Sequence, residues 1–297
     1  MIAYLILAHR SPSLVRRLIS RLASPESCFF VHIDRKSEFG PFRWALDEFN
    51  DKQLRLYQKI DTRWGEYSLV EATLFLLREA QRHAPHAHRY ILLSGQSYPI
   101  KPRSSIETIF EEAHQASYIE ADVLPDRLRH RVDRHYFSVR GWQRVYPPFQ
   151  APTTSRERLL NSIFKAIFKM PRSFPRSLTP HYGSQWWCLS RRAAEYVTDF
   201  VEQRPDFVRF QRHSHVPDEM FFQTILSSGP EDIVGGLVNR DLNFTIWEGD
   251  DQPSPAVLGA RHFERLRASD CLFARKFELT TETEILDRID RDLLGVS

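Results

Sequence analysis

The sequence holds three cysteines, Cys28, Cys188 and Cys271, an odd number spread far apart along its 297 residues. This spacing fits neither a disulfide framework nor a zinc site, and it favours a reducing compartment. There is no Gly-x-Gly-x-x-Gly and no Gly-x-x-x-x-Gly-Lys-Ser/Thr segment, which argues against a dinucleotide-binding fold and a P-loop. The formal net charge of +3 is too small to indicate a polyanionic partner by itself.

Long apolar runs are also missing. The N-terminal run Ile2–Ala8 stops at His9-Arg10, and it is far shorter than the roughly 20 apolar residues that a membrane-spanning helix needs. It has no basic region before it and no small-residue cleavage site, so we expect a buried strand and not a signal peptide. With 42% hydrophobic residues the chain can form a sizeable core, and we predict a single domain over 1–297.

Strand and helix signals alternate in the first third of the chain. Strands are expected over 2–9, 27–34, 53–60 and 90–95, with helices from Pro12, capped by Ser11, and over 67–84. Such a series predicts an α/β fold with a mostly parallel, Rossmann-like sheet, whose ligands bind beyond the carboxyl ends of the strands. His9, Asp34 and Ser94 stand at these ends. Asp34 could accept hydrogen bonds from a nucleotide, or it could simply form a turn.

The middle of the chain is rich in arginine and aromatic residues. Over 127–146 they interleave, a pattern that suits single-stranded nucleic acid, a sugar, or an ordinary surface on which arginines stack on rings. Residues 156–170 then form a basic amphipathic pattern followed by a proline-rich stretch to residue 180. This helix could lie on an anionic membrane, but packing on the core as an insertion near 150–180 is the interpretation we favour.

The last third contains Pro217-Asp218-Glu219 before an apolar helical pattern. Pro217 suits a first helical position and the two acids suit a first turn. A carboxylate held there could act as a general base, although both acids could also be solvated helix starters. Asp290-Arg291-Asp292 resembles a metal-binding Asp-x-Asp, but it falls in a C-terminal helical pattern, and we interpret it as a solvated face.

Six segments occur in one order along the chain: Ala3-Tyr4-Leu5-Ile6-Leu7-Ala8-His9, Phe30-Val31-His32-Ile33-Asp34-Arg35-Lys36-Ser37, Ser94-Gly95-Gln96-Ser97-Tyr98-Pro99-Ile100-Lys101, Gly183-Ser184-Gln185-Trp186-Trp187, Pro217-Asp218-Glu219 and Phe273-Ala274-Arg275-Lys276-Phe277. This ordered set resembles the core-2/I-branching β-1,6-N-acetylglucosaminyltransferase family, which also contains peptide O-xylosyltransferases. The resemblance implies a GT-A-like fold and an inverting transfer from a UDP-sugar without a divalent metal or other cofactor.

The resemblance also implies roles for single residues. Residues 1–115 would form the nucleotide-binding half, and residues 116–297 the acceptor and catalytic half. Glu219 would be the catalytic base and Lys276 would lie at the diphosphate, where its charge could replace a metal. The remaining expectations are a donor side that includes His9, Asp34, Trp64 and Arg275, and an acceptor side that includes Glu120, Arg131 and Trp186.

Several features depart from the family pattern. Ser97 stands where many relatives have an acid, and Pro253 stands where some have a second basic phosphate ligand, for which Arg275 or Arg261 could substitute. The disulfides and N-terminal anchor of the animal enzymes are missing, so we expect a cytoplasmic, bacterial-type enzyme. Peripheral contact with the inner face of the membrane is compatible with this expectation. N-acetylglucosamine is the expected sugar, with xylose as the alternative, and a surface glycan or its lipid-linked precursor is the expected acceptor. No nucleic acid partner is expected.

Overall fold

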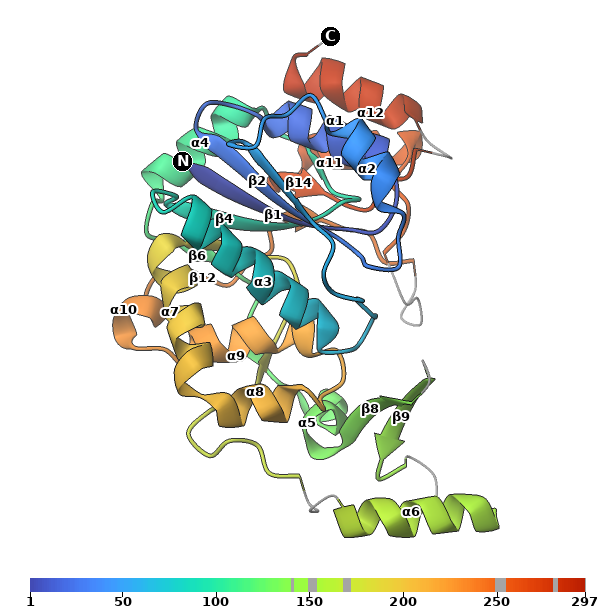
Figure 1. The fold of residues 1–297 in the computed structure, drawn as a ribbon. Coiled ribbons are helices and arrows are strands. Elements are labelled where there is room, and N and C mark those ends of the chain that lie inside the picture. The colour runs from blue at the N-terminus through green and yellow to red at the C-terminus, as the bar shows by residue number, and fades with distance from the viewer. Residues whose placement is uncertain (140–141, 149–153, 168–171, 249–254, 280–282, 297) are drawn as a thin grey trace.

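Seven strands form the central sheet, and helices cover both of its faces (Figure 1). The computed structural model describes residues 1–139, 142–148, 154–167, 172–248, 255–279 and 283–296. The strand order is β12-β6-β11-β4-β1-β2-β3, and all neighbours run parallel except the pairs that β11 makes. The strands are β1 (Ile2–Ala8), β2 (Ser27–Ile33), β3 (Leu54–Tyr57), β4 (Arg89–Ser94), β6 (Ser117–Tyr118), β11 (Cys188–Ser190) and β12 (Leu237–Val238).

The sheet is buried on both sides because β1 presents apolar side chains to each face. Tyr4 and Ile6 join one apolar cluster, while Ala3 and Leu5 join the other. This mostly parallel, Rossmann-like α/β sheet with helices on both faces is the fold class predicted from the sequence. The first face is covered by α1 (Pro12–Leu22), α2 (Phe39–Ala45), α4 (Arg103–Glu112), α11 (Phe263–Ala268) and α12 (Thr283–Ile289), and the second by α3 (Ser68–His83), α7 (Arg191–Gln203), α8 (Pro205–Gln211), α9 (Phe221–Ser227) and α10 (Glu231–Val234).

Short elements complete the fold. Small sheets join β5 (Tyr98–Pro99) with β13 (Asn243–Phe244) and β14 (Phe273–Ala274), and β7 (Asp122–Val123) with β10 (His181–Tyr182). Residues 134–180, called the insertion below, lie between α5 (His130–Asp133) and β10 in the chain. They contain the hairpin of β8 (His135–Val139) and β9 (Trp142–Tyr146) and the helix α6 (Ser155–Ile167).

Single turns cover Asp126–Leu128, Pro217–Glu219, Ala260–His262 and Asp290–Leu294.

The carboxyl ends of β1, β2 and β4 meet at one edge of the sheet, as predicted. The backbone N–H of Asp34 donates to the carbonyl of Ala8 at 2.8 Å, and that of Gly95 donates to Leu7 at 2.8 Å. A Cβ on Gly95 would lie 3.0 Å from the Cβ of Ala8, so glycine permits this close approach. The polar residues that follow the three strands are therefore neighbours.

Three local predictions differ from the structure. Ser11 has a φ of 54° and makes no side-chain cap, because Pro12 already starts the helix without an N–H to satisfy. The predicted strand over 242–247 is shortened to β13, Asn243–Phe244. The segment from Pro217 begins with a 3₁₀ turn, and the α-helix starts only at Phe221. Pro253 and residues 168–170 lie outside the described residues.

The prediction that Asp290 lies on a solvated face is wrong. Its side chain is buried, and its carboxylate accepts hydrogen bonds from Arg17 and Arg21, each at 2.6 Å, and from the Tyr98 hydroxyl at 2.6 Å. The arginines belong to α1, so this carboxylate fastens the C-terminal end of the chain to the first helix. Such partners repel a cation, so Asp290 does not fit a metal site.

The expectation that the basic helix packs on the core is also wrong. Neither apolar cluster contains a described residue of α6, and Figure 1 shows this helix at the far end of the insertion from the central sheet. Leu159, Leu160 and Ile163 are exposed. The physical reason is that the insertion supplies its own small contact surface, because Phe164 packs on Phe137 of the hairpin.

None of the described helices has the length and apolar content that crossing a lipid bilayer requires.

Candidate active site

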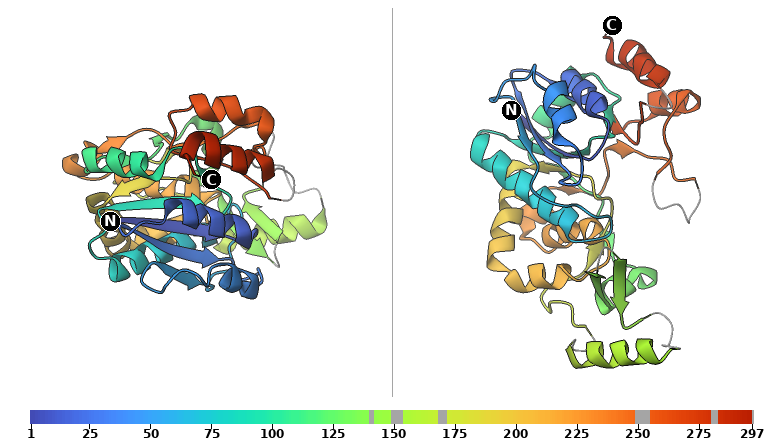
Figure 2. Two further views of the ribbon diagram at one scale, coloured as in Figure 1. Left: turned by 90° about the horizontal axis from the view of Figure 1, so that it is seen from above. Right: turned by 45° about the vertical axis from the view of Figure 1, so that its right-hand side comes forward.

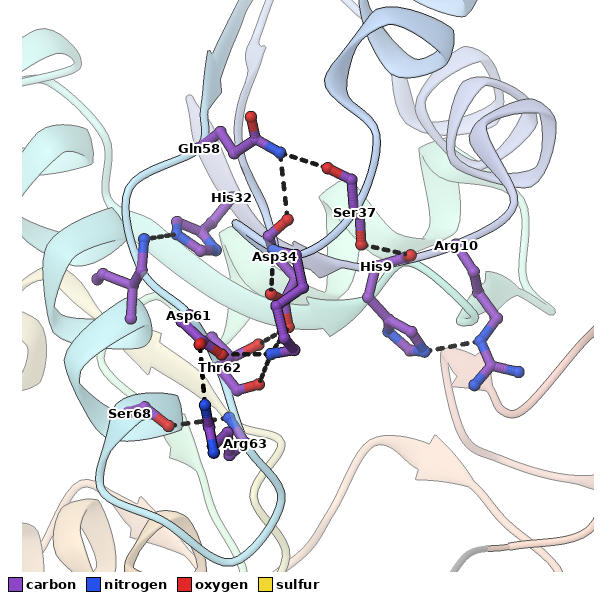
Figure 3. A network of polar contacts seen from close by, with 12 residues as sticks. His9, Arg10, His32, Asp34, Ser37, Gln58, Asp61, Thr62, Arg63 and Ser68 are labelled. Carbon is purple, nitrogen blue, oxygen red and sulfur yellow. Dashed lines mark hydrogen bonds and ion pairs between the residues drawn. The ribbon is translucent and has the colours of Figure 1, made fainter. Parts of the chain in front are cut away.

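Asp34 anchors a polar network at the carboxyl end of β2 (Figure 3). Its carboxylate accepts hydrogen bonds from the Thr62 hydroxyl at 2.5 Å, from the Lys36 backbone N–H at 2.9 Å and from Lys36 Nζ at 3.0 Å. Burial acts to raise the pKa of Asp34, but the bonds from Thr62 and Lys36 outweigh burial and hold this pKa below its ordinary value. Lys36 Nζ also contacts Asp61 at 2.5 Å. The network holds an ionised, largely buried carboxylate at the edge of the sheet where the fold class binds its ligands.

His9 and Arg10 follow β1 at the same edge. Arg10 Nε donates to His9 Nε2 at 2.7 Å, and the Ser37 hydroxyl donates to the His9 carbonyl at 2.7 Å. Burial and the charge of Arg10 lower the pKa of His9, so the imidazole is neutral at pH 7. Because Nε2 accepts from Arg10, the N–H of the neutral ring is on Nδ1. His9 therefore offers a hydrogen-bond donor beside Asp34 and not a second positive charge.

Lys276 is brought to this edge by backbone pairing. The N–H of Phe277 donates to the Gln96 carbonyl at 3.0 Å, and Arg10 forms an ion pair with Glu278 at 3.3 Å. Lys276 is close enough to His9 that its charge contributes to the lowered pKa of that histidine. An ammonium group, a neutral imidazole and a carboxylate thus surround the ends of β1 and β2.

Glu219 and Arg131 form an ion pair. Arg131 Nη1 donates to Glu219 Oε2 at 2.9 Å, with the arginine side chain 12% exposed and the glutamate side chain 35% exposed. Among the described residues Oε1 of Glu219 receives no hydrogen bond. A fixed carboxylate with one open oxygen suits proton abstraction from a bound hydroxyl. The two residues that the sequence assigned separately, as base and as acceptor-side arginine, are direct partners.

Glu120 is connected to Glu219 by hydrogen bonds from the loop that contains Gly183. The Gly183 N–H donates to the Glu219 carbonyl at 2.9 Å, and the Ser184 N–H donates to Glu120 Oε2 at 3.1 Å. A Cβ on Gly183 would overlap the carbonyl oxygen of Glu120, so residue 183 must be glycine. Burial raises the pKa of Glu120, and nearby carboxylates, including Glu219, add to this rise. The glycine is what allows these two acids to approach.

Trp186 and Arg275 contact each other inside the protein. The Arg275 guanidinium lies 4.8 Å from the centroid of the Trp186 ring, and this tryptophan is 6% exposed. Burial lowers the pKa of Arg275 to about 10, and the nearby Asp241 carboxylate opposes that change. Asp241 also accepts a hydrogen bond from the Ser184 hydroxyl at 2.5 Å. The Trp186 ring is thus covered and not presented to an acceptor, and Arg275 supports it.

Trp64 connects the two halves of the chain. Its ring is 64% exposed and stands edge-on to His215 at 5.9 Å, while His215 stacks on Tyr136 at 4.6 Å. The N–H of Val216 donates to the Gly65 carbonyl at 3.0 Å. Burial lowers the pKa of His215 to about 4, followed by the charges of Arg131 and His130, so His215 is neutral at pH 7. Trp64 offers an exposed ring next to the loop that carries Glu219.

The arginines of the basic segment 127–146 are engaged within the protein wherever the structure describes their side chains. Arg127 lies over the Tyr182 ring, Arg129 pairs with Asp133, and Arg134 donates to the Pro148 carbonyl. Arg131 holds Glu219, as described above. These contacts fit the alternative of an ordinary surface, on which arginines stack on rings or pair with neighbouring groups.

Across the described ranges, no group of three or more His, Cys, Asp or Glu side chains is arranged to hold a metal ion.

Asp218 gives a pH-dependent prediction. Burial and the charge of Glu219 raise its pKa to about 7, whereas an unfolded aspartate ionises near pH 3.9. The folded state keeps a proton that the unfolded state loses, so the stabilisation is complete below about pH 4 and is lost as the pH rises to about 7. Asp218→Asn cannot ionise. We expect the melting temperature of Asp218→Asn to rise relative to that of the wild type between about pH 4 and about pH 7 in calorimetry, and the difference to level off above about pH 7. A difference that stays constant from about pH 4 to about pH 7 would contradict this.

Several site contacts have no signal in the sequence. Asp241 stands in an ordinary loop before a strand, and Thr62 has no motif around it. Both are brought in by tertiary pairing, to Ser184 and Asp34 respectively. Gly183 was part of a recognised motif, but its steric role depends on the approach of Glu120, which no local pattern reveals.

Comparison with known proteins gives distant relatives over the full chain. The chain is 22% identical to xylosyltransferase 2 of Rattus norvegicus over 99% of its own length and 34% of that protein. It is 24% identical to the beta-glucuronosyltransferase GlcAT14B of Arabidopsis thaliana, over 99% of the chain and 66% of the relative. The chain therefore spans about a third of the length of the xylosyltransferases it matches.

Among solved structures, mouse xyloside xylosyltransferase 1 aligns with 95% of this chain and 99% of its own, at a TM-score of 0.39 and 13% identity. The sequence model of the Core-2/I-Branching enzyme matches residues 2–267. That match covers far more than half of the chain and includes the strand ends, the Gly183 loop and Glu219. The chain therefore belongs to the Core-2/I-branching family of glycosyltransferases.

Proposed function

We propose that this protein is a metal-independent, inverting glycosyltransferase that moves a sugar from a UDP-sugar to a hydroxyl group of a glycan. The observation that carries the proposal is the Glu219 carboxylate, held by Arg131 at 2.9 Å and joined through the Gly183 loop to Glu120. The strand ends with Asp34, His9 and Lys276 supply the second requirement, a polar site for the nucleotide.

Glu219 would act as the general base. As the acceptor oxygen attacks the anomeric carbon from the face opposite the leaving group, its proton passes to Glu219 Oε1 and the bond to the UDP oxygen breaks. One displacement of this kind inverts the anomeric centre. Arg131 holds Oε2, which fixes the carboxylate in one orientation and lowers the cost of positioning it.

Lys276 would stabilise the charge that develops on the departing diphosphate. Its ammonium group lies at the carboxyl edge of the sheet, where its charge is felt by His9. A fixed positive charge in a partly enclosed site does the work that a divalent cation does in other transferases. Asp34 would bind the ribose or base of the nucleotide, His9 would donate a hydrogen bond, and Trp64 would border the donor pocket with its exposed ring.

Glu120 and Arg131 would lie on the acceptor side, and Trp186 and Arg275 would support the site from beneath. The predicted acceptor contact of Trp186 changes accordingly, because its ring is buried under the guanidinium. Ser184, bonded to Asp241, connects this support to Glu120. The acceptor hydroxyl would therefore meet Glu219 next to a group of side chains that hold one another in place.

The transferred sugar is proposed as N-acetylglucosamine, with two alternatives. The xylosyltransferases and the glucuronosyltransferase among the relatives favour testing xylose and glucuronic acid as well. Their identities of 22% and 24% leave the contacts of the sugar free to differ. The acceptor is proposed as a glycan, free or lipid-linked.

Calorimetric titration tests the proposal. We expect UDP and one of UDP-N-acetylglucosamine, UDP-xylose or UDP-glucuronic acid to bind in the presence of a chelator. Lys276→Met should weaken UDP binding about ten-fold or more, since it removes one charge from the diphosphate. Lys52→Met, a substitution of an exposed lysine on the turn before β3, is the matched control and should leave binding unchanged. Binding only with added metal, or none at all, would overturn the proposal.

A further inference from the structure

Both ends of the insertion are connected to the acceptor side of the candidate site. It leaves the fold just after α5, whose Arg131 holds Glu219, and it returns at β10, next to Gly183. Figure 1 and the right-hand view of Figure 2 show the hairpin and α6 projecting together from this end of the molecule, opposite α12. Whatever α6 binds is therefore held on the side where the acceptor would enter.

The base of the insertion is firmly attached. Arg172 is 7% exposed, and its guanidinium lies 3.6 Å from the centroid of the Phe210 ring. It donates to the Arg134 carbonyl at 2.9 Å and to the Ser214 hydroxyl at 3.3 Å. The N–H of Tyr136 donates to the His213 carbonyl at 2.8 Å. Both chain segments that lead to α6 are thus fixed to the part of the protein that carries the catalytic loop.

The apolar face of α6 is open. Leu159, Leu160 and Ile163 are 63%, 43% and 44% exposed, and their spacing places them on one side of the helix. Phe164 is the described α6 residue that packs inward, with its ring 5.0 Å from Phe137 and 5.7 Å from Tyr146. These three large side chains are adjacent and form a continuous apolar strip. Single exposed apolar residues are normal on a protein surface, but a continuous strip indicates a contact with something outside the chain.

The charge of α6 indicates what covers this strip. Its sequence contains three basic residues, Arg156, Arg158 and Lys165, and one acid, Glu157. Glu157 is used in a capping box, because it accepts from the Thr154 N–H at 3.0 Å and its own N–H donates to the Thr154 hydroxyl at 3.2 Å. The helix is thus well started, basic and apolar on one side. A second copy of α6 would bring like charges together, whereas an anionic bilayer attracts them.

We propose that α6 docks the protein on the surface of a bilayer that contains anionic phospholipid. The helix lies in the plane of the interface, Leu159, Leu160 and Ile163 enter the boundary between headgroups and acyl chains, and the net positive charge of the helix is attracted to the anionic lipid. This docking turns the acceptor side toward the membrane, so that a lipid-linked glycan could reach Glu219; this last consequence alone rests on the proposed function.

Vesicle co-sedimentation of the full chain tests the proposal. Vesicles contain either phosphatidylcholine alone or equal parts of phosphatidylcholine and phosphatidylglycerol. We expect binding to the mixed vesicles that weakens at about 0.5 M salt, where charges are screened within about 4 Å. The triple variant Leu159→Ser, Leu160→Ser, Ile163→Ser should bind about ten-fold more weakly or worse, because it removes the apolar strip.

The matched control changes three valines of similar exposure on other elements, Val123→Ser, Val234→Ser and Val238→Ser, and should bind like the wild type. Unchanged melting temperature and UDP titration show that both variants are folded, and vesicle binding is read independently of transfer. Three results overturn the proposal: no binding of the wild type to mixed vesicles, equal binding by the α6 variant, or light scattering that shows a wild-type dimer which the α6 variant abolishes, without vesicle binding.

Discussion

Glu219→Gln is expected to lower the rate of sugar transfer about 10³-fold while UDP binding stays nearly unchanged. A general base contributes about 10²- to 10⁴-fold, and glutamine keeps the shape of glutamate but cannot take a proton. The amide oxygen can still accept the hydrogen bond from Arg131, so the loop should keep its position. Steady-state transfer assays and calorimetric UDP titration of the same preparation measure the two quantities.

The control for this variant is Glu48→Gln. Glu48 also forms a 2.8 Å ion pair with an arginine, Arg16, but it lies after α2 and away from the catalytic loop. Its loss should leave the rate of transfer unaltered. If Glu219→Gln kept most of its activity, or lost UDP binding together with activity, Glu219 would not be the base.

Gly183→Ala is expected to lower transfer by about 10²-fold and to destabilise the protein. The new methyl group would overlap the Glu120 carbonyl oxygen and would come within 3.1 Å of the Glu120 Cβ, so one backbone must move. That movement disturbs the hydrogen bond from the Gly183 N–H to the Glu219 carbonyl. A displacement of about 1 Å at a catalytic group costs about 10²-fold in rate. Transfer assays and thermal melting measure the two effects.

Gly40→Ala provides the matched control. Gly40 lies in α2, and a Cβ added there meets nothing within 4 Å. Alanine is favoured over glycine in a helix by about 1 kcal/mol, so this variant should be at least as stable as the wild type and fully active. Equal activity of the two variants would show that the Gly183 loop does not position Glu219.

Much of the fold could be predicted from the sequence because its signals are local. β1, β2 and β4 are buried over their whole length and consist largely of apolar residues, as is typical of strands covered on both faces, and α3 follows a clear helical period. Parallel strands then place His9 and Asp34 at one edge without any further information. The ordered motifs extended the prediction to Glu219 and Lys276, and their roles as base and diphosphate ligand stay predictions.

The tertiary structure decided which partner each polar side chain meets, because those contacts join residues far apart in sequence. Arg131 and Glu219 form an ion pair although they are 88 positions apart in the sequence. Asp290, near the C-terminus, pairs with arginines of α1, near the N-terminus. Neither pairing leaves a trace in local periodicity, and a charged residue on a helix looks the same whether water or an arginine faces it. The same holds for the exposed apolar face of α6. The amphipathic pattern in the sequence predicts that something covers this face. Only the tertiary structure, in which the insertion lies away from the central sheet, shows that the core does not cover it.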